Sequence, residues 1–174
     1  GSNSYTLITS NVEVTSDTSF SVTLNSNDQL NINGLLNKNG TNSGDSTTYN
    51  LAATDNWMQG ALASSDISDA TNAITVSNVS TPTITSSTYD ISTGILVVTG
   101  TNFVKKTGVT NDVDITKLTL TGQASGTRVL TTTNVEISSS TSFTVTLNSA
   151  DKTTVDTLLN KDGLSSIDSV TYNL

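Results

Sequence analysis

The 174-residue sequence contains no cysteine and no histidine, and its only proline is Pro82. The lack of cysteine excludes a disulfide framework and thiolate ligands for a metal. The lack of histidine removes the side chain that most often serves as a general acid or base near neutral pH. Acid–base chemistry would fall to carboxylates, lysines or tyrosines. We therefore expect that this chain is not an enzyme and that it has no catalytic residues.

Positive charge is also scarce, since seven Lys and Arg stand against fifteen Asp and Glu and the formal net charge is −8. A nucleic-acid interface needs a patch of lysine and arginine to neutralise phosphates, and the sequence has no such patch. An anionic membrane surface would repel the chain for the same reason. No apolar run approaches the roughly 20 residues that cross a bilayer. We expect no nucleic-acid partner and no membrane insertion of this fragment.

The chain is instead rich in Thr, Ser and Asn, around a hydrophobic set sufficient for a core. Leu, Ile, Val and Phe occupy 44 of 174 positions, above the level typical of disordered chains. Thr and Val at this density favour strands. No signal peptide is visible. Gly1-Ser2 is typical of residues left by an expression tag, so we expect any signal or anchor to lie outside this 174-residue fragment.

One phrase occurs twice: Thr18–Ser26 reads TSFSVTLNS, and Thr141–Ser149 reads TSFTVTLNS. Aligned without a gap, residues 5–51 and 128–174 are identical at 27 of 47 positions. An offset of 123 residues is too long for one turn of a solenoid and suits a whole domain per repeat. The sequence therefore predicts a slice of a tandem array.

Each copy carries the same two predicted elements. Alternating hydrophobic residues predict a half-buried strand over 20–24 and over 143–147. A short amphipathic helix is expected next, with Ser26 and Ser149 at the N-cap positions. The resulting prediction is a mostly β fold, with one short helix inserted in each unit.

The unrepeated middle of the chain supplies further strands and a boundary. Pro82 lacks the amide that a sheet requires, so we place the boundary near Ser80–Pro82. Residues 1–79 are then the C-terminal portion of one repeat unit, and residues 82–174 are the N-terminal portion of the next. The predicted strands of this region are 74–79, 83–89, 95–99 and 115–121.

The stretch Pro82–Phe103 (PTITSSTYDISTGILVVTGTNF) resembles the opening of IPT/TIG-type immunoglobulin-like domains, which end such a hairpin in a Gly-x-Asn-Phe corner. The later phrases NDVDITKLTLTG, NVEISSSTSFTVTLNSADK and LLNKDG, with TYNLAA and DNW of the first copy, resemble a repeat of about 120 residues in giant bacterial surface or secreted adhesin-type proteins. The resemblance implies immunoglobulin-like β-sandwich units, located at the bacterial cell surface or secreted. It implies a structural spacer or adhesion module and no catalytic residues.

The phase of the repeats predicts two incomplete units. A truncated sheet exposes an unpaired edge, and such edges recruit other strands. We expect the missing strand, equivalent to 74–79, to come from pairing of residues 1–79 with 82–127 in the same chain, or from a neighbouring molecule. The expected partners are therefore adjacent repeats or copies of the chain itself.

Two acidic clusters are candidates for calcium, which prefers carboxylate and carbonyl oxygens. No cofactor is required by the sequence, and ordinary solvated loop acids are the alternative interpretation of both clusters. Trp57 is a candidate platform for stacking a sugar, which would make the chain a glycan- or protein-binding module acting through its loops. The candidate calcium ligands are Asp55, Asp66, Asp69, Asn72, Asp112 and Asp114.

Overall fold

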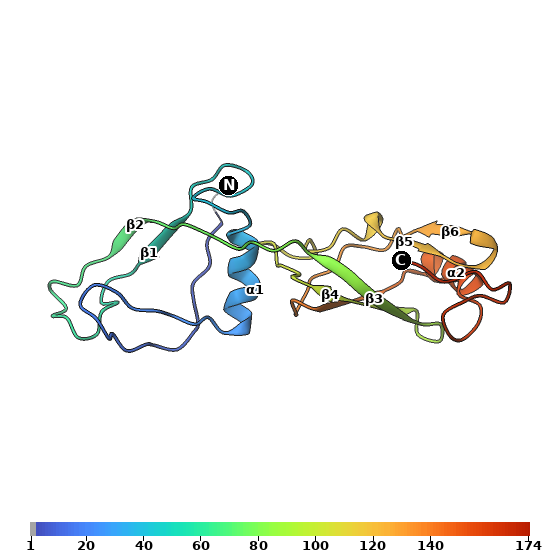
Figure 1. Cartoon of the computed structure of the whole chain (residues 1–174), viewed down its shortest axis with the longest axis horizontal. Coiled ribbons are helices and arrows are strands. Elements are labelled where there is room, and N and C mark those ends of the chain that lie inside the picture. The colour runs from blue at the N-terminus through green and yellow to red at the C-terminus, as the bar shows by residue number, and fades with distance from the viewer. Residues whose placement is uncertain (1–2) are drawn as a thin grey trace. The chain divides into compact units, whose positions relative to one another are not determined.

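Seven β-strands in three small sheets and two α-helices make up the computed structural model, which describes residues 3–174 (Figure 1). The predicted mostly β fold is confirmed, whereas the Gly1-Ser2 pair lies outside the described residues. The chain divides into two units: unit 1 ends at Ser80, and unit 2 comprises Thr81–Leu174. Within the described part, no helix has the length and apolar character needed to span a bilayer.

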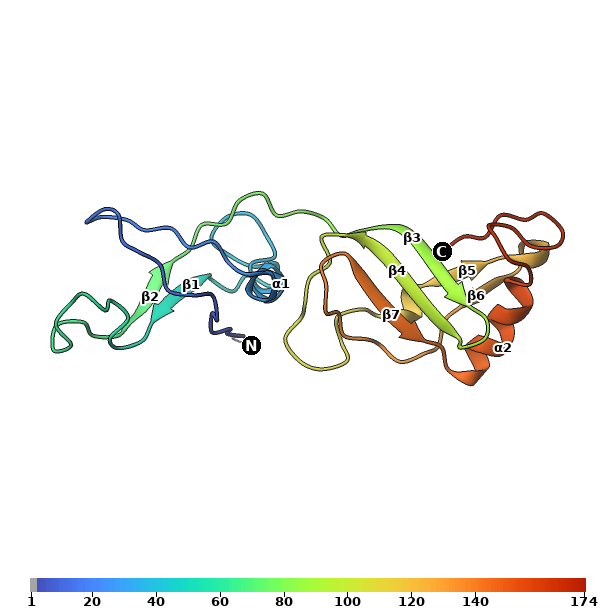
Figure 2. The same cartoon turned by 90° about the horizontal axis from the view of Figure 1, so that it is seen from below.

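The main sheet of unit 2 is built on a hairpin of β3 (Thr83–Asp90) and β4 (Ile95–Thr101) (Figure 2). The turn is closed by the Gly94 N–H, which donates to the Asp90 carbonyl at 2.8 Å. This hairpin confirms the strands expected over 83–89 and 95–99. On its other edge, β4 pairs antiparallel with β7 (Ser142–Thr146), the repeated strand of the second copy.

A second, two-stranded sheet of unit 2 joins β5 (Thr119–Thr121) and β6 (Thr127–Val129). The strand expected over 115–121 is only partly correct, because its first residues form a 3₁₀ turn, η1 (Ile115–Lys117). The Asp114 carboxylate caps this turn by accepting the Thr116 N–H at 3.1 Å. A second 3₁₀ turn, η2 (Gln123–Ser125), connects β5 to β6.

The core of unit 2 lies between these elements and the helix α2 (Ser149–Leu158), which contacts β6 and η2. Eight aliphatic side chains in this core are at most 3% exposed, so they supply most of the hydrophobic stabilisation of the unit. They are Leu96, Val98, Ile115, Leu120, Leu130, Ile137, Val145 and Val155.

The two helices, α1 (Ser26–Leu35) and α2, begin at equivalent positions of the repeat. Their N-caps are Asn25 and Asn148, so the prediction that Ser26 and Ser149 are the caps is wrong by one residue. Each asparagine accepts the amide of the third helical residue, at 2.9 and 2.8 Å. An asparagine oxygen satisfies that otherwise unpaired donor as well as a serine would, so both residues of the Asn-Ser pair were credible caps.

In unit 1, β1 (Asn50–Ala53) pairs antiparallel with β2 (Asp69–Ala73). The strand expected over 74–79 is therefore misplaced, and this segment contributes one bridge between Val76 and Gly40. The strand expected over 20–24 does not form at all. The described part of unit 1 contains no counterpart of β4 for this segment to pair with.

Candidate functional site

A buried carboxylate organises unit 2. Asp151, in the first turn of α2, is completely buried and accepts six hydrogen bonds. The Thr131 and Thr132 amides each donate to its Oδ2 at 2.7 Å, and both threonine hydroxyls donate to the carboxylate as well. Arg128 donates to Oδ1 from Nε at 2.9 Å and from Nη2 at 2.7 Å. The Asp151 carboxylate thereby joins the start of α2 to β6 and to the two threonines that follow it.

The same arrangement recurs in unit 1 around Asp28, which is also completely buried. The Thr9 amide and hydroxyl donate to Asp28 Oδ2 at 2.7 and 2.5 Å, and the Ile8 amide donates to the carboxylate at 3.1 Å. In place of an arginine, the Tyr5 hydroxyl donates to Oδ1 at 2.8 Å. Tyr5 and Arg128 occupy equivalent positions of the repeat, so one carboxylate site accepts either a neutral or a cationic donor.

Hydrogen bonding keeps both carboxylates ionised despite their burial. Burial alone would raise the pKa of Asp151, but donors on Thr132, Thr131 and Arg128 lower it to about 2. Burial opposes ionisation of Asp28 in the same way, and hydrogen bonds from Thr9, Tyr5 and the Ile8 amide again hold its pKa below the usual range. The oxygens of both carboxylates are thus held by donors of the protein itself.

These two carboxylates were missed as candidates because acidic residues near helix starts are common and usually solvated. A signal was nevertheless present in the sequence. Between positions 27–34 and the equivalent 150–157, the aspartate is the only identical residue. A single acidic residue retained inside a diverged helix marks a position held by contacts rather than by helix propensity.

Each copy also carries a loop closed by a tyrosine. The Tyr172 hydroxyl accepts the Lys161 N–H at 3.1 Å and donates to the Lys161 carbonyl at 3.1 Å. Tyr49 makes the same pair of bonds with Lys38, at 3.0 and 3.2 Å. The tyrosine ring thus fixes both ends of a loop eleven residues apart in sequence.

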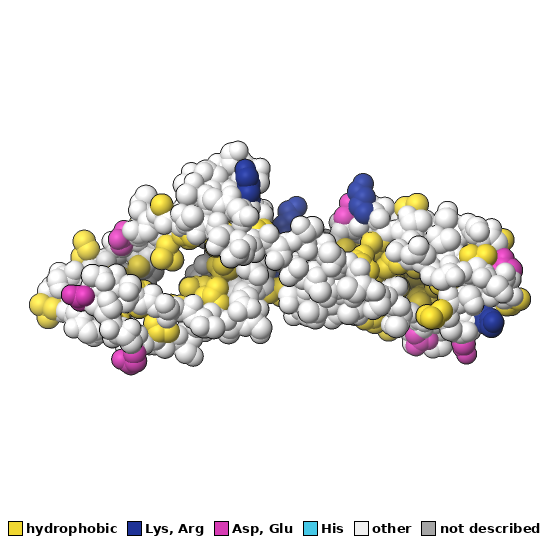
Figure 3. Space-filling view, viewed as in Figure 1, with side chains coloured by type: hydrophobic (Ala, Val, Ile, Leu, Met, Phe, Trp, Pro, Cys, Tyr) yellow, Lys and Arg dark blue, Asp and Glu magenta, His cyan; other side chains and the backbone are white. Residues whose placement is uncertain are grey.

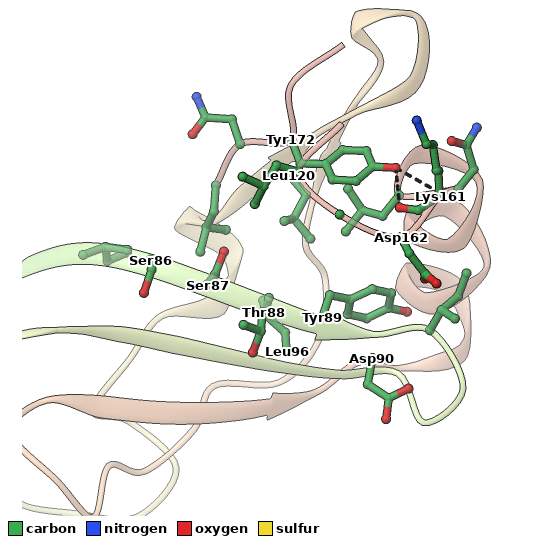
Figure 4. A pocket seen from close by; sticks show the side chains of 18 of the residues that line it. Ser86, Ser87, Thr88, Tyr89, Asp90, Leu96, Leu120, Lys161, Asp162 and Tyr172 are labelled. Atoms are coloured by element: carbon green, nitrogen blue, oxygen red, sulfur yellow. Dashed lines mark hydrogen bonds between the residues drawn. The ribbon is translucent and has the colours of Figure 1, made fainter. Parts of the chain in front are cut away.

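A groove of about 1210 Å³ lies in unit 2 between β3 and the segments that follow α2 (Figure 4). The Tyr89 side chain extends from β3 toward the loop that carries Lys161 and Asp162, and the Tyr172 hydroxyl reaches the same loop at Lys161. The Tyr89 hydroxyl donates to Asp156 at 2.6 Å, and burial together with this carboxylate raises the pKa of Tyr89. The groove is lined by hydroxyls, two tyrosine rings, acidic side chains and one lysine.

The first predicted calcium cluster lies in unit 1. Asp66 is buried, and its carboxylate accepts the Met58 amide at 2.7 Å. Asn72 uses its side-chain amide to donate to the backbone of β1 at 3.1 Å. Asp55 and Asp69 are exposed. The two residues with defined partners serve to hold the local backbone.

The second cluster lies in the loop before η1. Asp112 accepts the Lys106 amide at 2.6 Å and the Ile137 amide at 2.8 Å, so it ties two loops together. Asp114 is occupied in capping η1, where the Thr116 hydroxyl donates to it at 2.6 Å. Nowhere in the described chain do three or more acidic side chains form a metal-binding group. Calcium binding by either cluster stays a prediction.

The remaining candidate, Trp57, lies against Phe20 in unit 1, with ring centroids 6.3 Å apart and an interplanar angle of 33°. Both rings are nearly half exposed, at 44% and 46%. They belong to a wider exposure of hydrophobic side chains in unit 1, visible in Figure 3 among the polar surface. Trp57 belongs to unit 1, whereas the groove belongs to unit 2.

The chain matches no protein-family model, no curated protein and no solved structure. The features that define its chemistry are therefore those of its own two copies: a buried carboxylate, a tyrosine-closed loop, a groove in unit 2 and an exposed apolar segment in unit 1.

Proposed function

We propose that this chain is a non-enzymatic structural repeat module of a large bacterial cell-surface or secreted adhesin-like protein, built from immunoglobulin-like β-sandwich units. The observation that carries the proposal is the same buried polar network built twice, 123 residues apart, around Asp28 and Asp151. A network of this kind specifies how one module folds. Its repetition is what a chain made of successive modules requires.

The chemistry of the conserved interior of the two copies supports a structural role. Several hydroxyls and carboxylates that recur in both copies bond to one another, as Ser166 does to Asp168 and Ser43 to Asp45. A catalytic group must instead be aimed at a substrate and activated by a neighbour. The resemblance of the sequence to repeats of giant surface proteins supports the same conclusion from a different direction.

The proposal is tested on cells of the source bacterium. An antibody raised against the 174-residue chain should label intact cells or the culture medium, and brief protease treatment of intact cells should remove the cell-bound signal. The reactive polypeptide should be far larger than 18.1 kDa on a denaturing gel. A signal that appears only after lysis, on a polypeptide of about the size of the chain, would overturn the proposal.

A second candidate function is a glycan- or protein-binding module, which is favoured by the groove beside Tyr89. An aromatic face flanked by carboxylates and hydroxyls is the usual composition of a shallow sugar site. A glycan array and a peptide array probed with the chain should then give signals that Tyr89→Ala removes. Trp57→Ala is the matched control, because Trp57 lies in the other unit; a signal lost only with that variant would move the site to unit 1.

Calcium binding is tested independently of both functions. Titration with CaCl₂ should release or absorb heat and raise the Tm of the chain, and EDTA should reverse the rise. Asp112→Asn combined with Asp114→Asn addresses the second cluster, and Asp55→Asn combined with Asp69→Asn addresses the first. The absence of heat and of any thermal shift in the unsubstituted chain would remove calcium from this account.

A further inference from the structure

Equivalent hydrophobic side chains differ sharply in exposure between the two units. Phe143 is 6% exposed and Val145 is fully buried, whereas their counterparts Phe20 and Val22 are 46% and 39% exposed. The difference extends to two other repeated positions: Leu130 and Ile137 are buried, and their counterparts Leu7 and Val14 are 41% and 47% exposed. The side chains are the same or nearly so, and what differs is what covers them.

In unit 2, β4 pairs with the repeated segment and lies beside it in the sheet. Its inward residues Leu96 and Val98 lie opposite Val145 and Phe143 in the antiparallel pair, and both are at most 1% exposed. The backbone joins them further, since the Leu147 N–H donates to the Gly94 carbonyl at 2.9 Å. The hairpin β3–β4 thus provides both the hydrogen-bond partner and the apolar surface that the repeated segment needs.

The aromatic neighbours of the two phenylalanines also differ between the two units. Phe143 packs on Phe103, the residue that closes the corner after β4, with centroids 5.3 Å apart. Phe20 has Trp57 as its aromatic neighbour, at 6.3 Å. Phe20 thus has an aromatic neighbour from its own unit, but not one that follows a paired hairpin.

We propose that the segment Thr18–Leu24 of unit 1 is a docking site for a second copy of the β3–β4 hairpin, which pairs with it in the register seen between β4 and β7. Val98 of the incoming hairpin would lie opposite Phe20, and Leu96 opposite Val22. This inference rests on the proposed function, because a tandem array is what supplies further hairpins. It adds the occupant of the site, the register and the residues that recognise it.

The stoichiometry of the chain decides the source of the hairpin. The 174 residues hold two segments of the Thr18–Leu24 kind and one hairpin, and β7 already occupies that hairpin. Exchange between two identical chains would leave the same number of segments unpaired, so it gives no net gain. The occupant is therefore an additional hairpin, carried by another repeat.

The test titrates the whole chain with a synthetic peptide of residues 82–103. Trp57 is the only tryptophan of the chain and the peptide has none, so emission reports the site directly. The expected result is a saturable change in Trp57 emission at one peptide per chain. A peptide with Leu96→Asp and Val98→Asp should bind at least tenfold more weakly, because two carboxylates would enter the apolar face.

Two variants of the chain locate the site. Phe20→Ser should weaken peptide binding at least tenfold, whereas Ser21→Thr, which installs the residue found at the equivalent Thr144, should leave binding within twofold. Equal binding by the Phe20→Ser chain, or a one-to-one exchange of peptide for β4 seen by hydrogen exchange at Leu96, would overturn the proposal. Absence of binding to the unsubstituted chain leaves the decision to a covalent version of the test.

A covalent version covers the case in which the free peptide does not form a hairpin. In a chain extended so that residues 82–127 also precede Tyr5, the amides of Phe20 and Val22 should gain at least tenfold protection from hydrogen exchange, and Phe20→Ser should remove the gain. No gain in this chain overturns the inference. The cell-surface labelling described above is unaffected by either result, so failure of the docking site and failure of the proposed function are separate outcomes.

Discussion

The guanidinium of Arg128 and the carboxylate of Asp151 meet at 2.7 Å in unit 2, where the Asp151 side chain is completely buried and the Arg128 side chain is 26% exposed. At the equivalent position of unit 1, the Tyr5 hydroxyl reaches Asp28 at 2.8 Å. A threonine donor is present at both sites, as Thr9 in unit 1 and as the equivalent Thr132 in unit 2. Both copies of the motif thus keep the carboxylate, whereas the partly exposed donor changes from a tyrosine to an arginine.

The stability of unit 2 should decrease as the pH is lowered, because Asp151 then takes up a proton. Its pKa is lowered to about 2 in the folded protein from an ordinary value of 3.8. A lowered pKa stabilises the fold fully above pH 4 to 5, and the contribution, on the order of 2 kcal/mol, is lost as pH falls from about 4 to 2. Urea unfolding at intervals from pH 7 to pH 2 measures this loss.

The matched variant for the pH series is Asp151→Asn. It should lose about 3 kcal/mol at pH 7, because Arg128 keeps its charge without a partner and one amide oxygen replaces two acceptors. The pH dependence of the variant between pH 4 and 2 should also be shallower. An unchanged slope in Asp151→Asn would assign the acid sensitivity to other carboxylates.

The helix caps give a second prediction, on neighbouring residues. Asn148→Ala should destabilise unit 2 by about 1 kcal/mol, because the Asp151 amide loses the acceptor that lies 2.8 Å away. Ser149→Ala should change stability by less than about 0.5 kcal/mol, because its side chain does not cap the helix and alanine suits the first turn. Chemical denaturation of both variants checks the order. A larger loss of stability in Ser149→Ala than in Asn148→Ala would show that Ser149 is the N-cap, as the sequence predicts.

The two copies allow one substitution to be tested in two environments. Phe143→Ala should cost about 3 to 5 kcal/mol, as is usual for a buried phenylalanine. Phe20→Ala should cost about 1 kcal/mol or less, since its ring is nearly half exposed and its aromatic contact is with Trp57. Native-state hydrogen exchange separates the two units in one sample. Similar costs at both positions would mean that Phe20 is covered in solution.

Gly100 should tolerate no side chain. A Cβ at this position would lie 2.0 Å from the Thr83 carbonyl oxygen and 2.5 Å from the Phe103 ring. Gly100→Ala should therefore separate the start of β3 from β4 and cost at least about 2 kcal/mol, measured by thermal unfolding. Gly60→Ala is the control, because nothing lies within 4 Å of a Cβ there and the change should be near neutral or slightly stabilising.

Local patterns in the sequence were sufficient for the β3–β4 hairpin and for the starts of the two helices. The hairpin β3–β4 was predictable because alternation and a turn of Asp90–Gly94 lie within one short stretch. The starts of the helices were predictable to within one residue, because each helix follows a run of capping residues and carries apolar positions at helical spacing. The repeat itself needed no structure, since it is an identity between two parts of one chain.

What could not be predicted depends on partners distant in sequence. Residues 20–24 and 143–147 have nearly the same sequence, yet β7 is a strand and its counterpart is not, because pairing requires a neighbour that only unit 2 contains. Asp28 and Asp151 look like solvated helix-start acids until the threonines, nineteen or more residues earlier in the chain, are placed against them. The calcium candidates share this difficulty, since sequence spacing does not reveal which backbone amides the acidic side chains already bind.

In the loop closed by each tyrosine, the residues that fix the fold differ from the residues that form the surface. The ends of the loop are identical in the two copies, Lys38 with Tyr49 and Lys161 with Tyr172, but five of the ten residues between them differ. In the second copy the differences place Leu164 and Ile167 at the surface, 85% and 69% exposed, where the first has Thr41 and Gly44. Because the tyrosine fixes the two ends of the loop, successive copies can change the exposed side chains between them from polar to hydrophobic while the underlying fold stays the same.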